Sequence, residues 1–521
     1  MKYYPIHMHL HCSHESSASI HSHMSYAKSL GIDHIWTTEH DTRISKPAGR
    51  YFHFFFPEKA LYITLPSGKT AGFKEEENGG SYSFKEENGE ISLRAFSKKG
   101  EREALYFQSQ GKRHSDPLFS RVTVEISGDI NVKDCGRATV EFILSAQPPT
   151  YNQARLCYVS GDIPAADGSP TQYLPLPEKK DGKYIFELYK DVSEDIGGAD
   201  NALCNIRLIM ENGAEITLKD IGFYRELEYE KTRSAQKELV EKIGKIYGVK
   251  AFVGFEVTGA GNHKNCFSTK TPVIEYAKFD NKVSNEQAIE HLQKYGATYS
   301  WNHPFTKYVK SGKSREEIFE IVANDLIENR VYGAKLIETG FPAGRDIFEA
   351  KDFLRLWDEL SAAGIMITGY GDSDNHHAVE DCWTTGNNFC GFAGIEGEPT
   401  EENFVKAFNC GNLWSGNPVV IRDLSFTAGD KPQGSLIRGE SVEVEFSAKG
   451  IKCGGYAICI SNGEETARLP IKGGQVSGKW LLKAENDFNF ARVEIYNEED
   501  TLIAFSNPIY LARESAEVKE R

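Results

Sequence analysis

The stretch KYYPIHMHLHC (residues 2–12) starts as a short β-rich run and ends on His9-Leu10-His11. Residues two apart on an extended strand face the same way, so both imidazoles are expected to reach one ion. Histidine is the commonest side-chain metal ligand. Eight of the fifteen histidines fall in the first forty residues, at positions 7, 9, 11, 14, 21, 23, 34 and 40. This crowding indicates that the strand opens a site.

The same strand belongs to a recurring pattern: a helix-like stretch, a glycine, a short apolar run, then polar residues. The glycine suits the left-handed position that ends a helix, and the apolar run suits a buried parallel strand. Ser284 and Ser314, followed three residues later by Gln287 and Glu317, are typical helix starts. The repeats occur at 27–41, 244–257, 292–304, 331–340 and 360–374. Such units predict an α/β fold with a parallel sheet or barrel.

Polar side chains follow the predicted strands of these repeats. In α/β barrels, catalytic residues cluster at the carboxyl ends of the strands. A random scatter of core histidines would not favour one end of every strand. The residues at these ends are His9, His11, His40, Glu256, His303, Glu338, Asp374 and His376. The pattern therefore predicts one site that is assembled from distant segments.

Two regions of the chain have a different pattern. Alternating runs such as RVTVEIS (121–127) and SVEVEFSA (441–448) are typical of antiparallel β-sandwiches. We expect four segments: the first part of a barrel (1–50), an inserted β-sandwich (51–227), the second part of the barrel (228–415) and a C-terminal β-sandwich (416–521). Without the β regions roughly 240 residues remain, close to the usual barrel size of about 250.

The composition narrows the class of protein. The 521 residues are 40% hydrophobic and 26% charged, an ordinary mixture for a globular protein. No apolar run predicts a membrane span, the N-terminus lacks the apolar core of a secretion signal, and the cysteines form no Cys-x-x-Cys pair. These features predict a cytoplasmic protein. The formal charge of −15 disfavours a nucleic-acid partner, while bound cations would still admit a small anionic substrate.

Three motifs accompany the opening His-x-His: Glu-His-Asp (39–41), Asn-His-Pro (302–304) and Asp-Ser-Asp-Asn-His (372–376). Their order resembles the polymerase-and-histidinol-phosphatase (PHP) superfamily of metal-dependent phosphoesterases. The resemblance covers about 1–50 and 228–415, and it implies a distorted, TIM-like (β/α)7 barrel with two or three divalent metals at its mouth. The layout with two added β regions is similar to that of the CehA/McbA-like metallohydrolases.

The resemblance also implies a map of ligands. The first metal would bind His9, His11, Glu256 and Asp374. Glu256 would bridge to a second metal, completed by His263 and His303. A third ion would bind His40, His376 and Glu15, where Glu15 replaces the aspartate that many relatives carry. The catalytic residues implied are Glu256, His303 and Asp374.

Some placements remain open from the sequence. His377 is an alternative to its neighbour His376. His263 lies in a glycine-rich loop and is either a ligand or a solvent-facing residue. Glu338 is either a partner of the ligands or a carboxylate buried beside a helix.

The ligand set implies a chemistry. Zinc, manganese and iron all suit imidazole and carboxylate ligands. The resemblance implies hydrolysis of a small phosphate mono- or diester by a metal-bound hydroxide. From their positions in the sequence, we expect Arg43, just after the Glu-His-Asp motif, or Arg345 to anchor the substrate anion. One alternative is a carbamate or carboxylic-ester hydrolase with the same metals. Another is a binding protein with a degenerate barrel, whose sandwiches hold a carbohydrate or a protein partner.

Overall fold

The computed structural model of this chain describes residues 1–12, 18–45, 48–64, 70–76, 81–109, 116–165, 169–279, 283–309, 311–340, 348–376 and 389–517. Strands make up 45% of the described residues and helices 22%. The described strands are divided among several separate sheets. The predicted (β/α)7 barrel is therefore wrong, as is the TIM-like description, and the protein is mainly β.

The largest sheet contains the opening strand and combines parallel and antiparallel pairs. β1 is parallel to β2, with Ile6 opposite His34, and antiparallel to β24, with Tyr4 opposite Ala393. The C-terminal strands continue this sheet, because β25 pairs with β34. Its main path is β18 (Lys250–Val253), β2 (His34–Thr37), β1 (Lys2–Leu10), β24 (Cys390–Ile395), β25 (Leu413–Gly416), β34 (Leu502–Ser506), β33 (Phe488–Asn497), β30 (Gly455–Ser461) and β31 (Glu464–Pro470).

The remaining strands of the α/β region form two small sheets. β21 (Ser300–Trp301), β22 (Leu336–Gly340) and β23 (Thr368–Gly371) are parallel. β19 (Phe255–Val257) and β20 (Lys264–Cys266) form an antiparallel pair. The helix–glycine–strand repeats thus give local parallel pairs, as expected, but a local pattern does not specify that these pairs close into one barrel. This is the physical reason for the wrong prediction.

Seven described helices flank these strands. α5 and α6 begin with capping boxes at Ser284 and Ser314, which confirms the predicted starts. α4 ends at Gly248 with φ +65°, the left-handed conformation expected there. The helices are α1 (Ile20–Ser29), α2 (Asp41–Ile44), α4 (Tyr229–Tyr247), α5 (Asn285–Lys294), α6 (Arg315–Glu328), α7 (Ala350–Ala362) and α9 (Glu401–Cys410). In the part of the chain that is described, no helix is both long enough and apolar enough to cross a bilayer.

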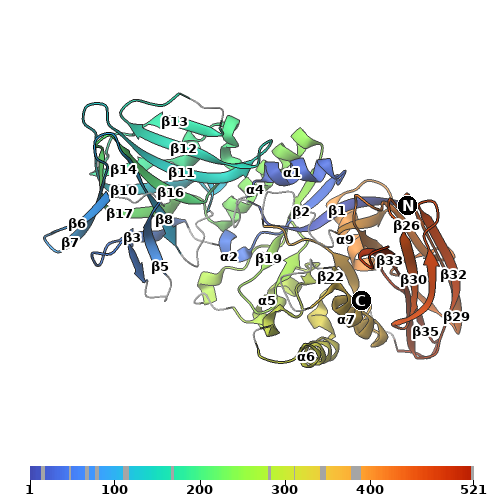
Figure 1. Ribbon diagram of the computed structural model, residues 1–521. Coiled ribbons are helices and arrows are strands. Elements are labelled where there is room, and N and C mark those ends of the chain that lie inside the picture. The colour runs from blue at the N-terminus through green and yellow to red at the C-terminus, as the bar shows by residue number, and fades with distance from the viewer. Residues whose placement is uncertain are drawn as a thin grey trace.

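The described residues between 49 and 225 form two large sheets and one two-stranded sheet, β9 (Asp116–Pro117) with β15 (Ala202–Leu203), at one end of the molecule (Figure 1). Aromatic side chains from both large sheets, including Phe107, Phe142, Phe186 and Phe223, share one core. One sheet is β13 (Thr171–Pro175), β12 (Asn152–Ser160), β11 (Arg137–Gln147), β16 (Asn205–Glu211), β8 (Arg102–Ser109), β5 (Thr70–Glu75) and β4 (Tyr62–Thr64). The other is β14 (Lys183–Phe186), β10 (Val122–Asn131), β17 (Glu215–Arg225), β7 (Glu90–Phe96) and β6 (Ser81–Glu87), with β3 (Gly49–Phe55) beside β17.

The C-terminal strands lie at the opposite end (Figure 1). A four-stranded sheet contains β27 (Lys431–Pro432), β26 (Asp423–Ala428), β29 (Ser441–Lys449) and β32 (Gln475–Lys483). Its Phe426 and Val444 share a core with Ala457 and Val493 of the largest sheet. Arg492 of β33 is buried and forms a two-point ion pair with Asp358 of α7, both contacts 2.7 Å long. The C-terminal strands are therefore joined to the α/β region by a sheet and an ion pair.

The inserted strands are held against the start of α1. Both carboxylate oxygens of Asp200 accept hydrogen bonds, at 2.8 Å each, from the backbone nitrogens of Ile20 and His21. Ser22 donates from Oγ to the carbonyl of Ala146 at 2.7 Å. A carboxylate satisfies the free N–H groups and favours the dipole at a helix N-terminus. The insertion thus fixes the helix that follows His11 in the chain.

Candidate metal centre

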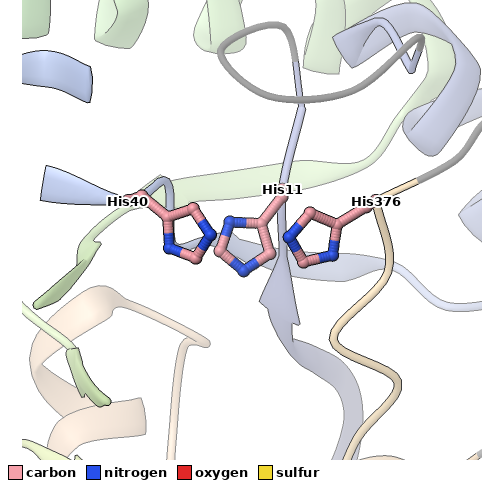
Figure 2. A group of neighbouring side chains, drawn as sticks. All are labelled: His11, His40 and His376. Atoms are coloured by element: carbon pink, nitrogen blue, oxygen red, sulfur yellow. The ribbon is translucent and has the colours of Figure 1, made fainter. Parts of the chain in front are cut away.

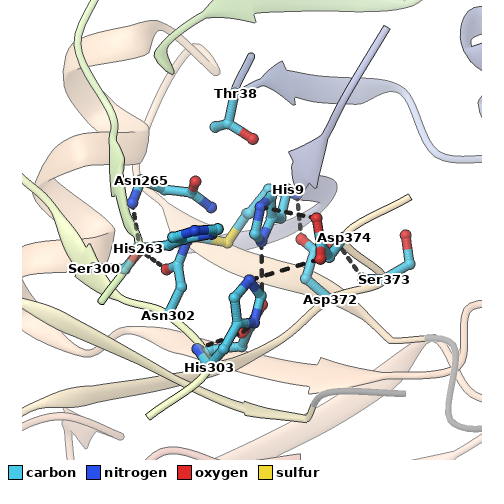
Figure 3. A network of polar contacts seen from close by, with 12 residues as sticks. His9, Thr38, His263, Asn265, Ser300, Asn302, His303, Asp372, Ser373 and Asp374 are labelled. Carbon is cyan, nitrogen blue, oxygen red and sulfur yellow. Dashed lines mark hydrogen bonds and ion pairs between the residues drawn. The ribbon is translucent and has the colours of Figure 1, made fainter. Parts of the chain in front are cut away.

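The predicted ligands come from the ends of strands in three sheets. His9 is in β1, with His11 one residue past it, and His40 lies shortly after β2. Glu256 is in β19, while His303 follows β21 and Asp374 follows β23. These ends meet in the α/β region, where the side chains of His9, His303 and Asp374 point toward one another (Figure 3). The structure therefore brings together residues that are up to 365 positions apart, between His9 and Asp374.

Glu256 is the centre of this group and is completely buried. Its oxygens lie close to nitrogens of His40 (2.7 Å), His263 (3.2 Å), His9 (3.4 Å), His303 (3.6 Å) and His11 (3.8 Å). The carboxylate that is predicted to bridge two metals thus lies among five imidazoles.

Asp374 faces three of the same imidazoles, those of His9, His11 and His303, and also that of His376. Its Oδ1 lies 3.0 Å from His11 Nε2, 3.3 Å from His9 Nε2 and 3.5 Å from His376 Nδ1. Its Oδ2 lies 3.6 Å from His303 Nε2. His9 and His11 therefore sit between two carboxylates, with their Nε2 atoms 3.1 Å apart.

His11, His40 and His376 form a group made of imidazoles only (Figure 2). The His11 ring lies between the other two, with centroid distances of 4.4 Å to His40 and 4.2 Å to His376. One nitrogen from each ring lies within 4.8 Å of the others. This is the position predicted for a third ion, to which Glu15 was also assigned, but Glu15 lies outside the described residues.

The pKa values of His9 and His11 shift in opposite directions, although the two rings lie next to each other. Burial lowers the pKa of His9, but Asp374 and Glu256 outweigh it and raise this pKa to about 10. Burial, together with His376 and His40, lowers the pKa of His11 to about 3. Burial alone would raise the carboxyl pKa values of Glu256 and Asp374, yet the surrounding histidines hold both well below the usual range. Both carboxylates are therefore ionised.

Two of the candidate ligands have a strained backbone. His303 has φ +43° and Asp374 has φ +47°. Residues other than glycine rarely adopt this left-handed conformation, which costs on the order of 1–3 kcal/mol. Such strain persists only when the surroundings enforce it, and it is concentrated at functional sites. The side chains of these two strained residues contact each other, with His303 Nε2 3.6 Å from Asp374 Oδ2.

A hydrogen-bond network that the sequence did not reveal supports the centre (Figure 3). Asn302 donates from Nδ2 to Glu256 Oε1 at 2.9 Å. Thr38 Oγ1 accepts from the backbone nitrogen of Leu10 at 3.2 Å and fixes the end of β1. For Asn302, the Asn-His-Pro motif was the sequence feature that could have indicated this role. For Thr38, no motif indicates one.

His7 shares the strand parity of His9 and His11 but lies outside the group. Its Nδ1 is 2.8 Å from Asp372 Oδ1, and its Nε2 is 2.9 Å from Ser373 Oγ. The register of β1 against β2 shifts between His7 and Leu10, and such an irregularity re-aims side chains. Asp372 Oδ2 also accepts from the backbone nitrogen of Met8 at 2.5 Å. This pair ties β1 to the end of β23.

Of the two arginines that are predicted to bind the substrate anion, Arg43 is among the described residues and Arg345 is not. Arg43 is half-buried in α2, three residues after His40, and its carbonyl accepts a hydrogen bond from Arg225. Its role as an anion anchor stays a prediction. Arg345 lies outside the described residues, as does His377. His263 is among the described residues. Its side chain is 35% exposed, and its Nδ1 lies 3.2 Å from Glu256 Oε1.

The donor set fits divalent cations. Four overlapping groups of three ligands occur among the described residues, and together they contain His9, His11, His40, Glu256, His263, His303, Glu338 and His376. Imidazole and carboxylate donors suit zinc, manganese and iron. Within the described chain, the side-chain ion pairs of Glu256 and Asp374 all involve histidines, with no lysine or arginine occupying the centre.

Comparisons with known proteins do not identify a family. No family model matches the chain, and no curated protein is significantly similar to it. A carbohydrate-binding module specific for non-crystalline cellulose is 16% identical over 29% of this chain and 84% of the module, with a TM-score of 0.17.

Two solved enzyme structures are also weakly similar. An endo-β-1,4-mannanase from Thermotoga petrophila is 11% identical over 54% of this chain and 61% of the enzyme, with a TM-score of 0.15. β-Glucuronidase 2 of Bacteroides uniformis is 7% identical over 84% of this chain and 61% of the enzyme, with a TM-score of 0.17. The chain thus spans less than two thirds of either enzyme. These TM-scores are too low to support any conclusion about fold or function.

Proposed function

We propose that the protein is a metal-dependent hydrolase acting on a small phosphate mono- or diester. The observation that carries this proposal is the set of five imidazoles around the buried Glu256. A buried carboxylate needs compensating charge or hydrogen bonds, and clustered ligands from distant segments are typical of a metal site. The motif order that resembles the PHP superfamily supports the same chemistry. A (β/α)7 barrel is not part of the proposal.

The residues of the centre would bind and align two or three divalent ions. Bound ions supply Lewis acidity, which lowers the pKa of water and neutralises negative charge on a phosphate ester. Glu256 and Asp374 each face histidines of more than one ligand group, so they would hold neighbouring ions close together. Asn302 fixes the direction of Glu256 by its hydrogen bond. The chain thus presets the ligand geometry before substrate arrives.

The exposure of the histidines indicates the side from which substrate approaches. His9 and His11 are fully buried, whereas the side chains of His40, His376 and His263 are 17%, 20% and 35% exposed. The exposed edge of the centre is therefore lined by these three residues. Arg43 lies three residues after His40, in α2. In the proposal it anchors the anionic group of the substrate.

Hydrolysis assays on purified, metal-loaded protein test this function. The substrates are p-nitrophenyl phosphate, bis(p-nitrophenyl) phosphate and p-nitrophenyl acetate. We expect hydrolysis of a phosphate ester that is lost in Glu256→Gln, whereas Glu494→Gln retains it, because Glu494 lies in the C-terminal strand β33. Hydrolysis of the acetate alone would instead support the carboxylic-ester alternative.

Metal content separates the enzyme from a binding protein. The proposal requires at least one ion per chain after purification without chelator. A chain that takes up substantially less than one ion, even from excess zinc or manganese, would support the binding alternative. The cytoplasmic location likewise stays a prediction.

A further inference from the structure

Glu338 is a fully buried carboxylate in β22, the central strand of the parallel three-stranded sheet. It makes three contacts with two of the candidate ligands. Its Oε1 lies 3.1 Å from His9 Nδ1. Its Oε2 lies 2.5 Å from His303 Nδ1 and accepts a hydrogen bond of 3.0 Å from the backbone nitrogen of His303. Each carboxylate oxygen of Glu338 therefore contacts one of the two histidines.

The other nitrogens of the same two rings point to the centre. His9 Nε2 lies 3.4 Å from Glu256 and 3.3 Å from Asp374. His303 Nε2 lies 3.6 Å from each of the same two carboxylates. The rings are stacked, with centroids 5.4 Å apart and planes 19° from parallel. Glu338 thus contacts the Nδ1 atoms of both rings, and both Nε2 atoms face Glu256 and Asp374.

We infer that Glu338 is a positioning residue that holds His9 and His303 together in the orientation and tautomer needed to bind metal through Nε2. A histidine whose Nδ1–H is donated to a carboxylate keeps the Nε2 lone pair for a metal and becomes a more basic ligand. This inference rests on the proposed metal centre and adds a specific coupling to it. One carboxylate supports a ligand of the predicted first ion and a ligand of the predicted second ion.

Glu338 also supports the strained backbone of the centre. The hydrogen bond to its Oε2 comes from the backbone nitrogen of His303, the residue with φ +43°. Loss of this acceptor would leave a buried N–H without its partner, which costs free energy. Ring orientation and backbone conformation at His303 are therefore stabilised by the same oxygen atom.

The test is metal affinity, measured by chelator competition with zinc on the full-length protein. Glu338→Gln preserves shape but removes the charge, and an amide cannot accept from both imidazoles. We expect at least two ions to bind about 10- to 100-fold more weakly, the usual effect of losing such a partner. Glu338→Asp, which keeps the charge but is too short to reach both rings, should lose less. The matched control Glu494→Gln changes a buried carboxylate that pairs with Arg492 and should leave zinc affinity unchanged.

Several outcomes would overturn the inference. Zinc affinity within twofold of wild type in Glu338→Gln, or in Glu338→Asp if the amide variant does not fold, would exclude a positioning role. So would a zinc-bound crystal structure with a Glu338 oxygen at about 2.0–2.2 Å from an ion, because Glu338 would then be a ligand itself. In both cases the wild type binds zinc and the proposed function stands. A wild-type chain that binds no metal would instead overturn the proposed function.

Discussion

Asn302 donates a hydrogen bond of 2.9 Å to Glu256, and this contact joins the central carboxylate to the β21–β22–β23 sheet. The amide has a fixed orientation, because its Oδ1 accepts from Ser300 Oγ at 2.5 Å and from Tyr370 OH at 3.1 Å. Glu256 Oε1 is thereby held from the sheet side. The histidines approach the same carboxylate from the remaining directions, which is the arrangement expected of a shared ligand.

Replacing Asn302 by Asp tests this relationship. The change puts a second carboxylate against Glu256 at hydrogen-bond distance, where two like charges repel unless a proton or cation lies between them. We expect a lower Tm in EDTA and a larger rise in Tm on zinc loading than in wild type, measured by calorimetry. Asn507→Asp is the control, because Asn507 donates to the carbonyls of Gly369 and Leu413 instead. An equal rise in Tm on zinc loading in Asn302→Asp and wild type would show that the contact between residue 302 and Glu256 is not part of a metal centre.

The backbone at Asp374 gives a second prediction. Asparagine tolerates the left-handed conformation about as well as aspartate, whereas alanine does not. Asp374→Asn and Asp374→Ala should both lose zinc affinity, because each removes the ligand charge. In EDTA, however, Asp374→Ala should be less stable than Asp374→Asn by about 1–2 kcal/mol in urea unfolding. Equal stability of the two variants would show that the φ of +47° carries no strain.

The imidazole-only group gives a third prediction. Nitrogen ligands favour zinc over magnesium, which prefers oxygen. His376→Ala should therefore lower the zinc content by one ion per chain, measured by mass spectrometry after dialysis. His291→Ala is the control, since His291 contacts the carbonyl of Pro272 in another part of the chain. An unchanged zinc content in His376→Ala would contradict the binding of a third ion by this group.

His34 gives a pH prediction that does not depend on metal. Burial lowers its pKa from 6.5 to about 4, and its Nδ1 lies 3.3 Å from the carbonyl of Pro5. Between these two pH values the unfolded chain binds a proton that the folded chain excludes, so stability falls as pH falls. At pH 5 this loss is about 2 kcal/mol relative to pH 7.

His34→Gln removes the titrating group. Urea unfolding in EDTA at pH 7 and pH 5 should then show a loss of stability that is smaller than in wild type by this amount. The comparison is between the two pH values within each protein, so a general destabilisation by the substitution does not affect it. An identical loss in both proteins would show that His34 is not the group responsible.

Much of the candidate centre could be predicted because its information is local. His9 and His11 follow from strand periodicity, and His40, His303 and Asp374 stand in short motifs at strand ends. The structure brings all five together around Glu256. Glu338 could not be assigned from its sequence context, because its two histidine partners are 329 and 35 positions away.

The wrong barrel has a related cause. β1 pairs antiparallel with β24, nearly 400 residues later, and β25 pairs with β34 of the C-terminal region. Nothing in the helix–glycine–strand pattern specifies such pairings, since register and partner depend on the tertiary packing of both faces. The repeats therefore predicted parallel neighbours, such as β1 with β2 and β22 with β23, but not the sheets in which these pairs are found.

The most direct measurement of the central claim is a crystal structure of the zinc-loaded protein with anomalous scattering recorded at the zinc edge. The account predicts at least two zinc ions, one of them about 2.0–2.2 Å from both His9 Nε2 and an oxygen of Glu256. Zinc-saturated crystals with no anomalous peak among these side chains would contradict it.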